Sequence, residues 1–174
     1  MQYDLNRFIA AQERDYEPAL KEIIEGFKRS HWMWYIFPQI SGLGHSPMAK
    51  KYEIVDLGEA KAYMENPYLR DNLIEICKAL LECGNDDIED IMGYPDNLKL
   101  CSCMTLFELA APEVDEFKEV LERFFGGKRD DRTIAIKAII IYTIGLRPRG
   151  ATYFHNTYVC PPISSDNLSE SLSQ

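Results

Sequence analysis

Apolar side chains recur every three or four residues over most of the chain, which is the spacing of helices that bury one face. The clearest stripe follows Asn66-Pro67 and ends before Gly84. Asparagine is a favoured helix cap and proline suits the first helical turn, so a helix is predicted from this pair onward. The stripe comprises Leu69, Leu73, Ile76, Cys77, Leu80 and Leu81.

Two helices are predicted before residue 28. One follows Asp4, a candidate N-cap, and the other carries Pro18 in its first turn. Gly26 stands near the end of the second helix, where glycine can take the left-handed conformation that caps a helix. The apolar positions are Leu5, Phe8 and Ile9 in the first helix and Leu20, Ile23, Ile24 and Phe27 in the second.

Capping residues mark three helix starts in the middle of the chain. Ser46-Pro47 precedes MAKKYEI, and Asp56 lies three residues before Glu59, which is the spacing of a capping box. Asp86 or Asp87 caps a short helical turn that ends near residue 92.

The next two helices are bounded by proline and glycine. Pro95 or Asp96 starts the helix NLKLCSCMTLFELAA, and Pro112 ends it. Gly126-Gly127 ends the following helix, whose apolar stripe is Val114, Phe117, Val120, Leu121, Phe124 and Phe125.

The last apolar segment is capped by Asp130 or Asp131 and includes the run AIIIYTI. Its β-branched residues would suit a strand, but the run continues the helical pattern TIAIKAI, so a helix is favoured. The tail SSDNLSESLSQ is polar and acidic and is predicted to be disordered. Four residues before it are apolar enough to dock on the domain: Tyr153, Phe154, Tyr158 and Val159.

These elements predict an all-α fold, a single-domain irregular bundle of about seven to nine short helices. A chain of 174 residues suits one domain. We assign the domain to residues 1–163 and the tail to residues 164–174.

Charge and composition narrow the function classes. The formal net charge is -9 and the pI is near 4.9, so the protein's field repels phosphate backbones and anionic membranes. General nucleic-acid binding and membrane binding are therefore not expected. The most apolar run, Ile134–Leu146, contains Lys137 and is shorter than the ~20 residues of a membrane span. The polar N-terminus shows no signal peptide.

The 5 cysteines are an odd number and two of them lie in a predicted helix, which is typical of reduced thiols in a cytoplasmic protein. Cys101 and Cys103 form a C-x-C and not the C-x-x-C of zinc or redox turns. No metal or other cofactor is predicted.

The segment KRSHWMWYIFPQISGLGHS, residues 28–46, is the first candidate site. Its aromatic residues either form a core plug or offer flat faces to a ligand ring. The polar residues beside them would cost several kcal/mol to bury unless they pair internally or meet a ligand. His31 is a candidate acid or base, and the candidate ligand-binding residues are Lys28, Arg29, Ser30, Trp32, Trp34, Gln39, Gly42, Gly44 and Ser46.

The turn Gly42-Leu43-Gly44 before a helix start has two interpretations. Glycine lets backbone N–H groups approach a ligand and a helix start favours anions, so the turn could cradle a phosphate or carboxylate. The alternative is an ordinary turn with a serine cap.

A second candidate site spans residues 96–107. On a helix, Asp96, Lys99 and Cys103 share one side, with Ser102 beside them. Lys99 could neutralise a ligand phosphate; the alternative is a surface ion pair.

Several segments together resemble the bacterial and fungal domain-of-unknown-function family 1810 over about residues 4–137: DLNRFIAAQ, GFKRSHWMWYIFPQISGLGHSPMAKKYEI, EAKAYMENPYLRDNL, DNLKLCSCMTLFELAAP and FFGGKRDDRTIAI. The resemblance implies an all-α, single-domain fold. Cys103 stands where members usually carry the second serine of KL-SSMTLF. The pattern is more distantly similar to the NADAR-type N-glycosidases, which is a likeness of fold only. Some members carry the label calpastatin, but nothing in this sequence supports a protease inhibitor.

Two function classes remain open. The first is an enzyme that hydrolyses an N-glycosidic bond in a nucleotide or ADP-ribose-like substrate. The second is a non-catalytic module that binds an anionic, ring-bearing small molecule in the same pocket, or that binds a protein partner, as the acidic tail also suggests. In the enzyme, Lys28, Arg29 and Lys99 would hold phosphate, His31 or Asp96 would transfer protons, and Trp32 or Trp34 would stack on the ring.

Overall fold

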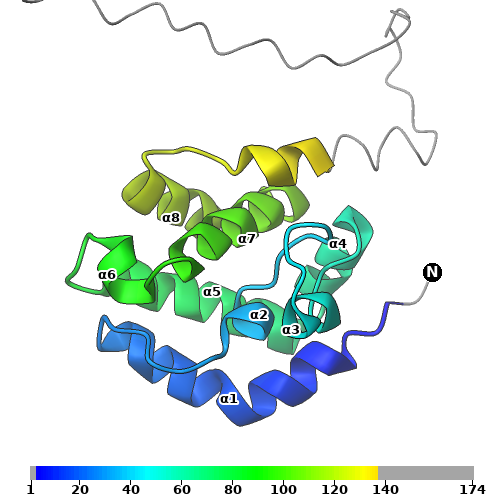
Figure 1. Ribbon diagram of the computed structural model, residues 1–174, viewed down its shortest axis with the longest axis horizontal. Coiled ribbons are helices and arrows are strands. Elements are labelled where there is room, and N and C mark those ends of the chain that lie inside the picture. Colours follow the sequence, from blue (N-terminus) through cyan, green and yellow to red (C-terminus); the bar gives the residue numbers. More distant parts are fainter. Residues whose placement is uncertain (1–2, 137–174) are drawn as a thin grey trace, which may run out of the picture.

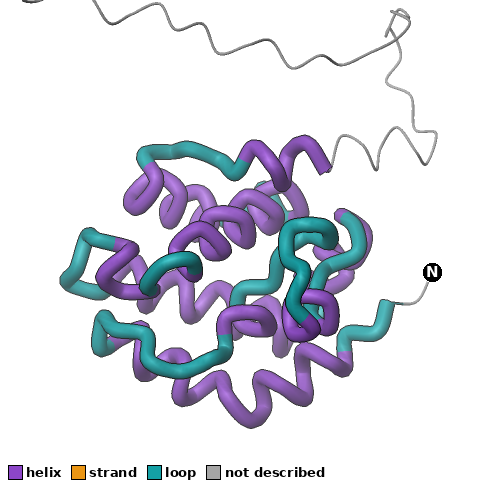
Figure 2. The backbone as a smooth tube through the Cα atoms, in the orientation of Figure 1, coloured by secondary structure: helices purple, strands orange, loops and turns teal. Residues whose placement is uncertain are grey.

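The computed structural model describes residues 3–136, which form helices joined by loops with no strand among them (Figures 1 and 2). A further helical stretch begins at residue 131 and reaches residue 136. The predicted all-α bundle of about seven to nine short helices is confirmed for this part of the chain. The helices are α1 (Asn6–Ile24), α2 (Met33–Ile36), α3 (Pro47–Lys51), α4 (Leu57–Glu65), α5 (Pro67–Glu82), α6 (Ile88–Met92), α7 (Asp96–Ala110) and α8 (Asp115–Phe125).

A row of aromatic rings runs through the core and joins four of these helices. Phe8 of α1 contacts Tyr63 of α4 at 5.3 Å between ring centroids, and Tyr63 contacts Phe107 of α7 at 5.1 Å. Phe117 of α8 completes the row at 5.9 Å from Phe107. Figure 1 shows α1 on one side of the molecule and α7 and α8 on the opposite side, with α5 between them.

The predicted division of the first helical segment at Pro18 is wrong, because α1 continues from Asn6 to Ile24 with Pro18 inside it. Proline removes one backbone hydrogen bond and bends a helix without always ending it. Tyr16, Ala19 and Ile23, on both sides of Pro18, are buried and hold the bent helix against the core. Figure 1 shows the bend near the middle of α1.

The predicted capping residues are confirmed at most helix starts. Asn66, Ser46 and Asp56 each accept a hydrogen bond from the backbone N–H three residues later. The first helix differs, because its cap position is Leu5 and not the predicted Asp4, although the Asp4 carboxylate still accepts from the N–H of Asn6. Where two caps were possible, Asp87 caps α6, Pro95 precedes α7, and Asp130 caps the stretch that begins at residue 131.

The cysteines within residues 3–136 are free thiols, and all of them except Cys101 are buried. Cys77 and Cys103 are fully buried beside Met104, and the Cys77 thiol lies 3.6 Å from the Met104 sulfur. Burial raises the pKa of both thiols well above the ordinary range. Cys101 is only half-buried. Within residues 3–136, no group of three or more histidines, cysteines or acidic residues is arranged to hold a metal ion.

None of the helices in the described range is both long and apolar enough to cross a membrane. The helix predicted for AIIIYTI, the docking of residues 153–159 and the disorder of residues 164–174 all fall outside the described residues.

Candidate functional site

The loop after α1 is folded back over a single buried carboxylate, Glu22. Gly26 takes a left-handed conformation with φ 72°, and the N–H of Phe27 donates to the carbonyl of Glu22 at 3.0 Å. This reversal is a common helix ending, and here it returns residues 29–32 to the last turn of α1.

The Glu22 carboxylate accepts four hydrogen bonds from that loop. The donors are the N–H of Arg29 at 2.9 Å, the N–H of Ser30 at 3.1 Å, the indole N–H of Trp32 at 2.8 Å and the Ser30 hydroxyl. Burial by itself would raise the pKa of this carboxyl, but these donors outweigh it and lower the pKa to about 2. Glu22 therefore holds the loop as an ionised carboxylate.

Contacts within the protein explain the positions of three predicted ligand-binding residues, Arg29, Ser30 and Trp32, without a ligand. The Ser30 hydroxyl is used by Glu22, and the Trp32 ring is 1% exposed. The Arg29 guanidinium is exposed and lies 2.5 Å from a Glu25 oxygen. In this segment, internal pairing is the alternative that the geometry favours.

The two candidate sites meet at Asp96. Lys28 Nζ lies 2.8 Å from one oxygen of this carboxylate, and Lys99 Nζ lies 2.7 Å from the other. Each lysine also lies over a tryptophan, Lys28 at 5.0 Å from the Trp32 ring centroid and Lys99 at 5.1 Å from that of Trp34. Burial opposes ionisation of Asp96, but the hydrogen bonds and charges of both lysines lower its pKa. The cluster carries two positive charges and one negative charge.

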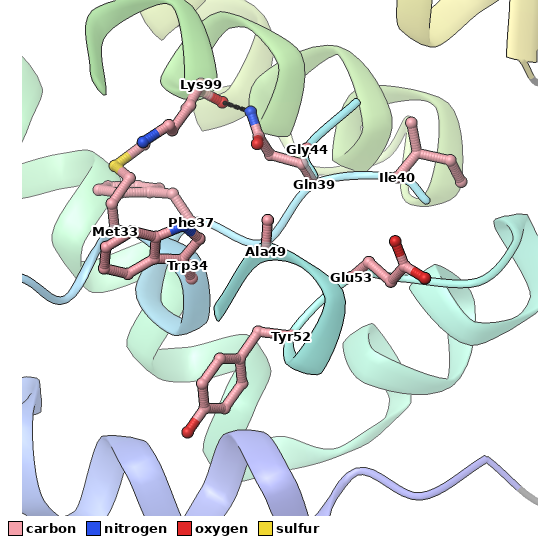
Figure 3. Close-up of a pocket in the computed structure, with 10 residues that line it drawn as sticks. All are labelled: Met33, Trp34, Phe37, Gln39, Ile40, Gly44, Ala49, Tyr52, Glu53 and Lys99. Carbon is pink, nitrogen blue, oxygen red and sulfur yellow. Dashed lines mark hydrogen bonds between the residues drawn. The ribbon is translucent and has the colours of Figure 1, made fainter. Parts of the chain in front are cut away.

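A shallow hollow lies beside Lys99, between α2, α3 and the start of α7 (Figure 3). The Gln39 amide crosses its edge and donates to the carbonyl of Lys99 at 3.2 Å. The hollow offers about 10 Å³ to the centre of a water molecule, which is room for one water. It is lined by Met33, Trp34, Phe37, Gln39, Ile40, Gly44, Ala49, Tyr52, Glu53 and Lys99.

The turn at residues 42–44 has the geometry of an ordinary capped turn. The Ser46 hydroxyl accepts from the N–H of Ala49 and so occupies the start of α3, which is only five residues long. Gly44 is needed for packing, because an added Cβ would lie 2.5 Å from Cβ of Ala49. Ile136 approaches the same turn, with its Cδ1 3.6 Å from where a Cβ would stand at Gly42.

Two of the remaining predicted residues do not line the hollow. His31 is exposed, and its carbonyl accepts from the Tyr35 hydroxyl at 3.2 Å. The Ser102 hydroxyl bonds to Leu98 O and to the Asp130 carboxylate, both at 3.1 Å, and helps to hold the end of the described chain on α7.

The structure therefore gathers part of the predicted set and adds to it. Trp34, Gln39, Gly44 and Lys99 line the hollow, and Lys28 and Asp96 adjoin it through the shared ion pairs. Glu53 was missed: its carboxylate lies on the opposite wall, 3.2 Å from Lys50 Nζ. No motif marks it, since it comes after a short helix with ordinary surface spacing.

Comparisons with known proteins agree with the fold and leave the chemistry open. The family described as protein of unknown function (DUF1810) matches residues 2–137. The chain is also similar to the crystal structure of the conserved hypothetical protein Rv1873 from Mycobacterium tuberculosis. The two share 43% identity with a TM-score of 0.77, over 78% of this chain and 97% of that one. A search of curated proteins gave no significant match.

Proposed function

The chain belongs to the DUF1810 family, and from this premise we propose that its domain binds an anionic, ring-bearing small molecule, such as a nucleotide or sugar phosphate, beside Lys99 and Trp34. The observation that carries this proposal is the pairing of the Lys99 ammonium with the Trp34 ring at the edge of the hollow. An ammonium group attracts a phosphate, and an aromatic face accepts a ring.

The local charge supports an anion over a neutral ligand. Among residues 3–136, Lys28 and Lys99 share Asp96 as their only ion-pair partner, and Glu53 on the opposite wall pairs with Lys50. One positive charge is therefore left over at this site, in a chain whose formal net charge is -9. Because the hollow holds only about one water, the ligand ring would lie across its open edge and not inside it.

Binding without catalysis is better supported than hydrolysis of an N-glycosidic bond. Asp96 has a lowered pKa and both of its oxygens are paired with lysines, so it is poorly suited to take up or donate a proton near neutral pH. His31 does not line the hollow. If hydrolysis occurs, Glu53 is the carboxylate in the lining of the hollow that would have to act. Release of adenine from AMP by wild type but not by Glu53→Gln would establish hydrolysis as the function.

Calorimetry should show that AMP, ADP-ribose and ribose 5-phosphate bind more tightly than adenosine and ribose. Lys99→Ala removes the ammonium at the edge of the hollow and should weaken AMP binding by about tenfold, as expected for a hydrogen bond to a charged group. Arg29→Ala is the matched control, because Arg29 is a nearby cation that pairs with Glu25 away from the hollow. Equal affinities for AMP and adenosine, or a Lys99→Ala variant that binds AMP like wild type, would refute the proposal.

A further inference from the structure

Lys28 and Lys99 share one carboxylate, but they are held very differently. The Lys28 side chain is 7% exposed, and its Nζ also donates to the carbonyl of Ser30 at 2.7 Å. Lys99 is 25% exposed and borders the hollow, which Lys28 does not. Lys28 is therefore fixed in place, while Lys99 can exchange partners at the surface.

We infer that Lys28 is a positioning residue that allows Lys99 to leave Asp96 and pair with an incoming anion. The inference rests on the proposed function, since it describes how the same site accepts its ligand. Lys28 keeps the half-buried Asp96 compensated throughout, so Asp96 is not left as an unpaired charge when Lys99 moves away.

The electrostatics give this exchange its direction. Two ammonium groups on the two oxygens of one carboxylate repel each other, so each weakens the other's bond to Asp96. When Lys99 leaves Asp96, it therefore gives up less electrostatic attraction than it would if Asp96 had no second lysine beside it. Its exposure also lets water solvate the ammonium during the exchange. A ligand anion then supplies an attraction that is not shared with a second cation.

A static ion-pair cluster is the alternative. It would only fasten the loop after α1 to the start of α7, beside the backbone hydrogen bond of 2.7 Å that the N–H of Lys28 donates to the carbonyl of Ile91 in α6. In that case removing Lys28 would change stability and leave the behaviour of Lys99 unaltered. The reactivity of the Lys99 amine separates the two explanations.

The first test measures acetylation of Lys99 by acetic anhydride in the ligand-free full chain, followed by mass spectrometry. Lys28→Met keeps an apolar stem over Trp32 and removes the charge, so Asp96 should hold Lys99 more tightly and slow its acetylation by roughly three- to tenfold. Lys28→Arg keeps the charge and should react like wild type. Lys28→Gln is the second neutral variant if Lys28→Met does not fold, and unchanged Lys99 reactivity in the folded neutral variant would overturn the inference.

The second test measures AMP binding by calorimetry in the same variants. Lys28→Met should weaken AMP binding by roughly threefold or more although Lys28 does not line the hollow, and Asp96→Asn should tighten it by releasing Lys99. If wild type shows no preference for AMP over adenosine, the proposed function fails, and the ligand role of Lys99 fails with it. If wild type prefers AMP but neither variant changes its affinity, the proposed function stands and the positioning role of Lys28 is overturned.

Discussion

Replacing Glu22 by alanine is expected to lower the free energy of unfolding by about 3–5 kcal/mol, because it removes the ionised acceptor of four hydrogen bonds and a bond to a charged group contributes about 1.5–3 kcal/mol. The change leaves the Trp32 indole and the backbone N–H groups of Arg29 and Ser30 without their acceptor. The Trp32 indole is buried, where an unsatisfied donor costs about 1–3 kcal/mol, and the two backbone N–H groups are part-buried and cost less. Urea unfolding followed by tryptophan fluorescence measures the change directly.

The same carboxylate should make stability depend on pH in the acid range. The pKa of Glu22 falls from its ordinary value of 4.5 to about 2 in the folded chain, so folding favours the ionised form. This contribution is fully present above about pH 4.5 and is lost as the pH falls toward about 2, with a total of about 3 kcal/mol. Glu22→Gln should show a smaller loss of stability over that window than wild type.

Glu25→Ala is the matched control, because Glu25 directly follows α1, three residues after Glu22, and its ion pairs with Arg29 and Lys21 are both exposed. Its effect on unfolding should be within experimental error. A Glu22→Ala variant as stable as Glu25→Ala would show that the loop does not depend on the buried carboxylate.

Gly44→Ala should destabilise the protein by about 1–3 kcal/mol through overpacking. The new Cβ would stand 2.5 Å from Cβ of Ala49, and neither atom can rotate away because both are fixed by the backbone. α3 must therefore move from the turn, and this movement also displaces one wall of the hollow. Thermal unfolding by circular dichroism measures the cost.

Two further variants test whether contact with α3 is the cause. Gly84→Ala introduces the same methyl group where nothing lies within 4 Å, so it should leave stability unchanged or slightly raised. Adding Ala49→Gly to Gly44→Ala removes the opposing Cβ and should restore part of the loss, less about 1 kcal/mol for glycine in a helix. Equal effects of Gly44→Ala and Gly84→Ala, or no recovery in the double variant, would exclude the steric explanation.

Most of the fold could be predicted because helix ends carry local chemical signals. Asn66, Ser46 and Asp87 act on N–H groups two or three residues away, and such short-range bonds can be inferred from spacing alone. The helix start predicted at Pro18 was wrong because the local preference of proline competes with the burial of Tyr16 and Ile23 on either side of it. Burial depends on distant parts of the chain, and here it is the stronger effect.

The candidate site was harder to predict, since its contacts join residues that are far apart in sequence. Lys28 and Lys99 were both expected to hold an anion, but their shared partner Asp96 was assigned to proton transfer. Glu22 was missed as the partner of Ser30 and Trp32, because a single glutamate in the last turn of an amphipathic helix reads as an exposed residue. Only the reversal at Gly26 brings the loop to it.

The rates at which the buried thiols are chemically modified can report how often the core of this domain opens. A thiol reagent can reach Cys77 and Cys103 only when the core around them separates, so their modification rates report the frequency of global unfolding. Cys101 is half-buried and can be exposed by a smaller fluctuation at the surface of α7. In Gly44→Ala, rapid modification of Cys77 and Cys103 would indicate that the whole domain opens more often. If Cys77 and Cys103 are modified as slowly as in wild type, the substitution disturbs only α3 and the edge of the hollow.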